Sequence, residues 1–350
     1  MRSHSGNQIH GFIIQNVEDN PNSISHMVTE EFGISRQSAY RYFKKLTKDG
    51  ILIPKGNTRN RTYEIKPIVE KTFPMPINTS VEDDMVWREN LIPLLKGVKP
   101  NVMSICQYGF TEMFNNVIDH SEGSYTSVEF KYTPARIKIS VFDNGIGIFN
   151  KIVRDLKLED QLQAILELAK GKLTTDPVNH TGEGIFFTSR IFDKFSILSG
   201  KLFFSHITEA DDWLIEDRES EMQGTLVTMF IGHNSNKTIQ EVFNKYALEE
   251  FDFSRTHFPV ALAAYGEENL VSRSQAKRIL ARIDRFKEVL LDFKGVDFIS
   301  RAFSDEIFRV YKNSHPNIKI IWVNANENVE GIIRRTMQGA NENQLPDLRT

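Results

Sequence analysis

Three polar side chains in the segment GFTEMFNNVIDHSEG recur every four residues: Glu112, Asn116 and His120. Because residues four apart share one face of an α-helix, this spacing aligns a carboxylate, an amide and an imidazole. An amide oxygen can ligate Mg²⁺, and a carboxylate can hold or deprotonate an attacking water or hydroxyl. The alternative reading is a solvated helix face, which such residues form more often. The pattern alone is weak and needs support from other motifs.

A second motif follows in RIKISVFDNGIGI. Apolar residues alternate from Ile137 to Val141, which predicts a strand that ends at Asp143. Gly145 and Gly147 then predict a tight turn in which the backbone can approach a ligand closely. Asp143 could accept a hydrogen bond from an adenine amino group. The alternative is an ordinary hairpin, because Asp-Asn-Gly is also a common turn sequence.

Two further glycine motifs lie downstream. Gly182 and Gly184 precede the apolar run IFFTSRIF, which predicts a helix. Free N–H groups at a helix start favour an anion such as phosphate. Gly224 and Thr225 begin the predicted strand QGTLVTMFI, where the threonine could line a base pocket, although threonine is common in strands.

The four motifs in this order resemble the GHKL ATPase superfamily, which includes gyrase, histidine kinases, mismatch-repair ATPases and anti-sigma serine kinases. The resemblance implies an α/β sandwich of the Bergerat type over residues 78–235 that binds ATP with Mg²⁺. It implies that Glu112 is catalytic and that Asn116 is the metal ligand. The other nucleotide-binding residues that it implies are His120, Asp143, Gly145, Gly147, Gly182, Gly184 and Thr225.

The position of His120 is most similar to the anti-sigma kinase branch, since histidine kinases usually have Asn where this chain has Glu112. Residues 149–181 take the place of the family's ATP lid. Four residues there could meet phosphates: Lys172, Thr174, Thr175 and His180.

The N-terminal segment predicts a small basic domain over residues 1–66. A helix is expected at 24–32 after a Ser23 cap, and Gly33 ends it. A second helix follows a Ser35 cap and runs to about residue 49. Two strands, ILIP and TYEI, then flank the basic tip KGNTRNR.

This order resembles a winged helix-turn-helix, in which the second helix enters the major groove of DNA and the wing contacts the backbone. Residues 1–66 hold ten Lys or Arg against six Asp or Glu. The predicted DNA-binding residues are Arg36, Gln37, Arg41, Lys55, Arg59 and Arg61. The alternative is a winged helix that contacts proteins.

The C-terminal segment, residues 238–345, alternates strand and helix, which predicts an α/β layer. VLLDFKGVDFIS is similar to STAS domains, the anti-sigma-factor antagonists, and closest to an uncharacterised STAS-like family. Typical antagonists have a phosphorylated serine at the helix start, where this chain has 300–303, SRAF. Ser300 and Ser304 flank that position, and we interpret them as a helix cap and a surface serine.

Bulk properties agree with an α/β multidomain protein. The 350 residues suit two or three domains, and a net charge of −3 confines nucleic-acid binding to a local patch. Prolines in residues 67–77 predict a linker. A single cysteine, Cys106, excludes an internal disulfide and is interpreted as a buried thiol. The absence of a signal peptide and of a long apolar run predicts a cytoplasmic protein with no membrane contact.

We therefore expect an ATP-dependent, DNA-binding regulator with slow ATP turnover and a protein partner at the STAS-like domain. The resemblance also implies a homodimer, which would suit a palindromic DNA site. Two alternatives stay open. One is a serine/threonine kinase that acts on a STAS-like domain or partner, and the other is a nucleotide-gated scaffold without chemistry.

Overall fold

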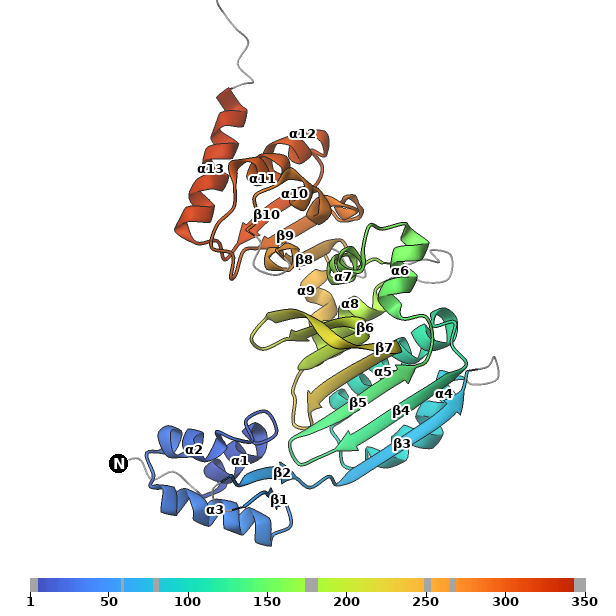
Figure 1. Cartoon of the computed structure of the whole chain (residues 1–350), viewed down its shortest axis with the longest axis vertical. Helices are drawn as coiled ribbons and strands as arrows, with labels where there is room; N and C mark the ends of the chain where they lie inside the picture. The colour runs from blue at the N-terminus through green and yellow to red at the C-terminus, as the bar shows by residue number, and fades with distance from the viewer. Residues whose placement is uncertain are drawn as a thin grey trace, which may run out of the picture.

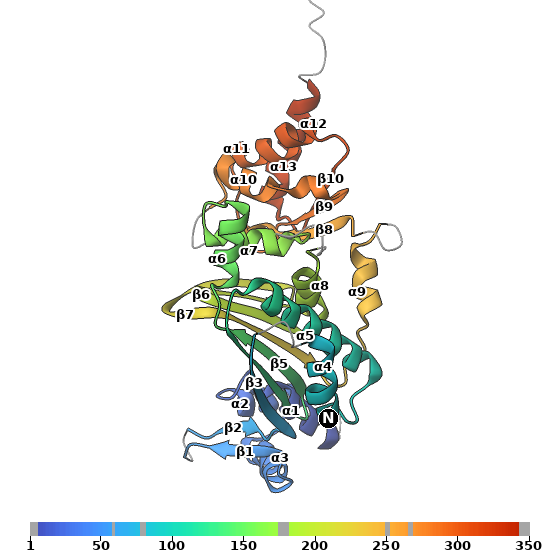
Figure 2. The ribbon, with the colours of Figure 1, turned by 90° about the vertical axis from the view of Figure 1, so that its right-hand side faces the viewer.

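The computed structural model describes residues 6–57, 60–77, 82–173, 182–248, 253–264 and 269–342 of a mixed α/β protein. The chain forms a two-stranded, a five-stranded and a three-stranded sheet, each with its own helices. These units follow one another along the long axis of the molecule, from the N-terminal helices to the C-terminal parallel sheet (Figures 1 and 2).

The N-terminal unit contains three helices and a hairpin. Its elements are α1 (Gly6–Asn16), α2 (Ile24–Phe32), α3 (Arg36–Lys48), β1 (Leu52–Lys55) and β2 (Thr62–Ile65), with β1 and β2 antiparallel. The expected helices and strands are therefore confirmed. Gly33 ends α2 at a φ of 61°, and the side chain of Ser35 accepts a hydrogen bond from the Ser38 amide. The predicted Ser23 cap is wrong, because its hydroxyl contacts the sulfur of Met27 instead.

Helix α1 is an addition to the elements expected from the sequence. Ile9, Ile13 and Val17 recur at every fourth position and are buried in the core of this unit. That spacing was the available signal for an amphipathic helix.

The central unit is an antiparallel sheet. Its strands lie in the order β3 (Val69–Pro76), β4 (Tyr125–Tyr132), β5 (Arg136–Asp143), β7 (Asp212–Gly232) and β6 (Lys194–Ile207). The linker predicted at 67–77 is corrected, because β3 pairs with β4 along its whole length. Pro74 and Pro76 are compatible with a strand here because β3 is at the edge of the sheet.

Helices cover one face of this sheet, as both views show (Figures 1 and 2). They are α4 (Asp83–Val86), η1 (Trp87–Leu91), η2 (Ile92–Leu94), α5 (Pro100–His120) and α8 (Gly184–Ile191), while α6 (Ile148–Leu156) and α7 (Gln161–Lys170) lie toward the C-terminal unit. Ile137, Ile139 and Val141 of β5 point into the resulting core. The expected strand start at Gly224 is wrong, because β7 begins at Asp212 in a long hairpin with β6.

The C-terminal unit is a parallel sheet in the order β10 (Lys319–Val323), β9 (Glu288–Asp292) and β8 (Arg255–Pro259). Its helical segments are η3 (Val260–Ala263), α10 (Arg273–Leu280), η4 (Ile283–Arg285), α11 (Arg301–Asp305), η5 (Glu306–Tyr311), α12 (Lys312–Ser314) and α13 (Glu327–Glu342). The central strand β9 is buried, whereas β10 is only half-buried because it is an edge strand.

Two hydrophobic cores underlie the three units. The N-terminal unit has its own core, whereas the central and C-terminal units share a continuous one. Phe253 joins them, because it packs on Phe186 and Phe187 of α8 and edge-on against Phe286 of the C-terminal unit. Helix α9 (Ile239–Tyr246) extends the central packing, with Phe243 on Phe187 and Tyr246 edge-on against Phe186. The packing of the central unit thus continues past residue 235, where we expected it to end. In the described ranges, no helix combines the length and hydropathy needed to cross a membrane.

Candidate functional site

A cavity of about 350 Å³ lies between α5, the end of β5, the middle of β7 and the helices α6 to α8. Eight of the nine predicted nucleotide-site residues line it: Glu112, Asn116, His120, Asp143, Gly147, Gly182, Gly184 and Thr225. These residues come from four motifs separated by up to about a hundred positions, and the fold brings them around a single cavity.

Asp143 is buried at the end of β5 and is directly opposite Thr225 of β7. Its Oδ1 accepts a hydrogen bond of 2.8 Å from the Gly145 amide. Burial raises the pKa of the Asp143 carboxyl, although hydrogen bonds with Gly145 and Thr225 oppose the rise. The Thr225 hydroxyl also accepts a hydrogen bond of 3.0 Å from the Ile148 amide, which fixes the first residue of α6 against the strand.

The two glycines after Asp143 have different positions. Gly147 lines the cavity with a φ of 86°, a conformation that favours glycine. Gly145 does not line the cavity, and a Cβ there would lie 2.0 Å from the Ser121 carbonyl oxygen. Gly145 therefore permits the close contact of this turn with the end of α5. The turn leads into α6 and not into a hairpin, so the alternative reading of Asp-Asn-Gly is wrong.

Glu112, Asn116 and His120 share one face of α5, as their spacing predicted, and that face is toward the cavity. Glu112 faces the start of α8, where a Cβ on Gly184 would lie 2.0 Å from Glu112 Oε2. Only glycine at position 184 therefore lets the carboxylate approach the helix N-terminus so closely. Burial raises the pKa of the nearby Tyr108 hydroxyl, and the charges of Glu112 and Glu183 raise it further.

Lys151 of α6 is a cavity residue that the sequence analysis missed. Its Nζ lies 2.7 Å from an Asp155 oxygen and 3.4 Å from a Glu122 oxygen. The available signal was its place four residues after Gly147, one turn into the helix that the glycine begins.

Leu168 and Leu173, from the region predicted as a lid, line the cavity beside α7. Lys172 does not line it, and its Nζ donates to the Arg285 carbonyl 3.2 Å away in the C-terminal unit. The remaining predicted lid contacts, Thr174, Thr175 and His180, lie outside the described residues.

The other side of α7 is buried against the C-terminal unit. Lys170 is 1% exposed, and its Nζ lies 2.7 Å from Glu167 Oε1. The same Nζ donates to the carbonyl oxygens of Arg278 and Ala281 at the end of α10, at 2.9 and 2.8 Å. The Lys170 carbonyl accepts from the Thr256 hydroxyl of β8. Residues 167–173 therefore form a wall between the cavity and the C-terminal unit.

The predicted DNA-binding residues of α3 lie on its exposed face. Arg36, Gln37 and Arg41 are exposed, as are Tyr40 and Lys44, which the sequence analysis did not select. Tyr40 lies four residues after Arg36, and Lys44 lies four residues after Tyr40, so the three share one side of the helix.

On the hairpin, Arg61 is exposed and Lys55 lies 3.3 Å from Glu64, so part of its charge is offset. Arg59 lies outside the described residues.

The two serines near the start of α11 are not arranged as exposed acceptors. The Ser300 hydroxyl accepts from the Phe303 amide at 3.1 Å, which confirms the cap, and it donates to the Val271 carbonyl. The surface position predicted for Ser304 is wrong, because this residue is fully buried on the inner side of the helix.

Comparison with protein families identifies a STAS-like domain of unknown function (DUF4325) at residues 275–330. This match covers β9, β10 and the helices between them, so the chain carries a STAS-like domain in its C-terminal unit. A search among curated proteins found no match to the chain.

Proposed function

We propose that this protein is an ATP-binding, DNA-binding regulator in which a GHKL-type domain acts as a nucleotide switch. Residues 1–66 would be a winged helix-turn-helix, residues 78–235 the ATP domain and residues 238–345 the STAS-like domain. The observation that carries the proposal is the convergence of the predicted residues on one cavity, with a buried carboxylate, Asp143, at one side and the start of α8 at the other.

The donors around the cavity suit ATP with Mg²⁺. Glu112, Glu183 and Asn116 all line the cavity, and their carboxylate and amide oxygens are donors appropriate to a hard cation. Asn116 would hold the ion, and the ion would neutralise phosphate charge next to those carboxylates. Asp143 would accept a hydrogen bond from the adenine amino group, and Glu112 would position a water molecule or hydroxyl for attack.

The role of Glu112 can be tested with γ-labelled ATP and Mg²⁺. We expect wild-type protein to release labelled phosphate slowly, and Glu112→Ala to bind ATP but to lose this release by about 100-fold, the size of a general-base contribution. Asn115→Ala, also in the cavity lining, is the matched control on α5. Normal turnover by Glu112→Ala would exclude this residue as the catalytic group.

DNA binding through the first unit rests on the exposed basic face of α3 and the basic hairpin. Replacing Arg59 and Arg61 together with alanine should weaken binding and reduce the dependence of affinity on salt, because fewer counterions are released. Glu64→Ala is a control that should strengthen DNA binding, since it frees Lys55 from its ion pair. Unchanged DNA binding by the double variant would indicate that the hairpin contacts proteins and not DNA.

The STAS-like domain in the same chain favours the second candidate, a serine/threonine kinase of the anti-sigma type. The capped Ser300 and the buried Ser304 argue against phosphorylation within the chain, so its substrate would be a separate STAS-like protein. In the labelled-ATP assay, label that stays on a partner serine would support the kinase, and free phosphate would support the switch.

A further inference from the structure

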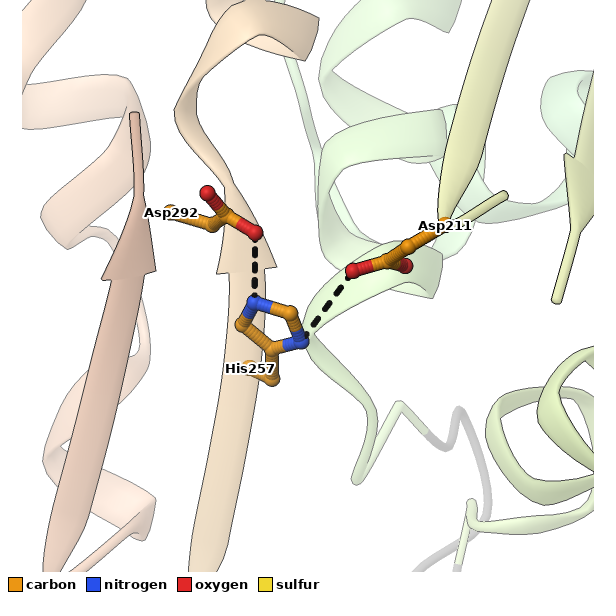
Figure 3. Close-up of side chains that lie close together, drawn as sticks. All are labelled: Asp211, His257 and Asp292. Carbon is orange, nitrogen blue, oxygen red and sulfur yellow. Dashed lines mark hydrogen bonds and ion pairs between the residues drawn. The ribbon is translucent and has the colours of Figure 1, made fainter. Parts of the chain in front are cut away.

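A separate cluster of ionisable side chains lies where the β6–β7 hairpin meets the parallel sheet, away from the cavity residues. Asp211 comes from the hairpin turn, His257 from β8 and Asp292 from the end of β9 (Figure 3). The ligand atoms of the three side chains all lie within 4.8 Å of one another. The cluster joins the central unit to the STAS-like unit.

The two contacts of the His257 ring differ in kind. Nε2 lies 2.9 Å from Asp292 Oδ2, which is a hydrogen bond, so this nitrogen carries a proton. In the neutral ring, Nδ1 then presents its lone pair. Nδ1 lies 4.0 Å from Asp211 Oδ2, too far for a hydrogen bond, so two electron-pair donors face each other across a gap (Figure 3).

Neighbouring groups hold both carboxylates in this orientation. Asp292 Oδ1 accepts from the Lys294 amide and the Asn324 side chain, each at 2.9 Å, which leaves Oδ2 for the imidazole. Asp211 Oδ1 accepts from Trp213 Nε1 at 3.2 Å, with His206 Nε2 also 3.2 Å away. Its Oδ2 is therefore the oxygen that faces His257.

The nearby cations do not pair with these carboxylates. Lys294 Nζ donates to the Ala210 carbonyl, and the buried guanidinium of Arg190 donates to the carbonyl oxygens of Ala169 and His257. In the described part of the chain, the basic side chains within 4.0 Å of the Asp211 and Asp292 carboxylates are the imidazoles of His206 and His257.

We propose that His257 Nδ1 and Asp211 Oδ2 bind a divalent transition-metal ion of the Zn²⁺ type, with Asp292 orienting the imidazole. In a tetrahedral site with bonds of about 2 Å, two donor atoms lie roughly 3.3 Å apart. Nδ1 and Oδ2, which lie 4.0 Å apart without the ion, would therefore move slightly closer when it binds. A carboxylate on the second ring nitrogen is the usual support of a metal-bound histidine. Asp211 is 39% exposed, so water can complete the coordination. The ion would fasten the hairpin of the central unit to β8 of the C-terminal unit.

The test uses the full chain, stripped with chelator and free of ATP, titrated with Zn²⁺ and with Co²⁺ as a spectroscopic probe. We expect one ion per chain, a visible Co²⁺ spectrum with nitrogen ligation, and a higher unfolding temperature with Zn²⁺. Asp292→Asn should weaken binding by about 10- to 100-fold, as loss of an orienting partner does, and His257→Gln should abolish it. Asp305→Asn, whose carboxylate pairs with Arg309, should leave binding unchanged.

Two measurements keep the result independent of variant folding. X-ray absorption at the zinc edge of the wild-type complex should show one nitrogen-containing ligand among oxygens. Nitrogen NMR of the His257 ring should show a metal-dependent change at Nδ1. Failure to bind Zn²⁺, binding unaffected by His257→Gln, or a ring that keeps protons on both nitrogens in the presence of Zn²⁺ would overturn the proposal.

Discussion

Asp143 has an environment that is unfavourable to an ionised carboxylate, because its carboxyl group is buried beside the cavity. Its pKa is raised in the folded protein, so the folded state binds a proton more tightly than the unfolded state. The favourable contribution is complete below the unfolded pKa of about 4 and is lost as the pH rises through the folded value. At neutral pH the ionised group therefore lowers the free energy of unfolding.

The variant Asp143→Asn should be more stable than the wild-type protein at neutral pH but should not bind ATP. At pH 7 we expect a free energy of unfolding higher by on the order of 1 kcal/mol, because the amide oxygen can still accept from Gly145 without a buried charge. The gain should disappear near pH 3, and ATP binding should be lost. Denaturant melts at both pH values, with nucleotide titrations alongside, provide the measurement. Asp305→Asn is the control, since its pKa is lowered by Arg309 and no gain is expected. A gain for Asp305→Asn equal to that of Asp143→Asn would contradict the explanation.

At the scale of single residues, the sequence predicted those positions that follow from regular spacing. The four-residue period placed Glu112, Asn116 and His120 on one face, and the strand end placed Asp143. Lys151 was missed although its place four residues after Gly147 was an available signal. The Asp211–His257–Asp292 cluster could not be predicted, because its proximity depends on how two units meet. Gly145 was selected for the ligand, whereas its close neighbour is the Ser121 carbonyl.

At the scale of elements, α7 connects the cavity with the C-terminal unit. Burial lowers the pKa of Lys170, and the ion pair with Glu167 opposes this. Both side chains are almost fully buried, so each depends on the other to compensate its lost hydration. Glu167 has a second cation, Arg282, at 3.6 Å.

Lys170→Met should lower the free energy of unfolding by about 3 kcal/mol, because the buried Glu167 carboxylate loses its direct partner. Adding Glu167→Gln should recover a large part of that loss, since the remaining side chain is uncharged. Urea denaturation of the two single variants and the double variant gives the coupling energy between the two positions. Simple additivity would show that the pair is not coupled in the folded state.

Sequence patterns predicted elements best where periodicity was regular, as in α2, α3, α5 and β5. β3 was missed because its prolines were taken as breaks, yet Phe73, Met75 and Ile77 alternate toward the core. The start of β7 was misplaced because the polar run 216–221 interrupts the hydrophobic pattern, although Trp213 and Ile215 before it pack against the core.

At the scale of the whole molecule, the hydrophobic cores do not coincide with the segments that the sequence motifs indicate. The N-terminal unit has a separate core and meets the sheet through polar contacts, with Arg136 2.9 Å from Glu18 and 2.8 Å from Asp19. The central and C-terminal units share aromatic packing through Phe253, which contacts Phe187 on one side and Phe286 on the other. The sequence indicated three segments, but it could not show which of them fold together.

A fragment of residues 67–350 should therefore remain folded and retain nucleotide binding. A fragment of residues 1–237 should be unstable, because Phe186 and Phe187 of α8 lose the aromatic rings that cover them. Size-exclusion chromatography and thermal melts of the two fragments provide the comparison. A stable, monomeric 1–237 fragment with full nucleotide affinity would show that the central unit is independent.

The wall formed by residues 167–173 also limits how this architecture can be recombined. Its Leu168 and Leu173 side chains shape the cavity, while its Lys170 side chain fits the end of α10. A chimera that exchanges the STAS-like unit for that of another protein would alter the support of one cavity wall. Such an exchange should succeed only when the α7 segment is transplanted together with the unit on which it rests.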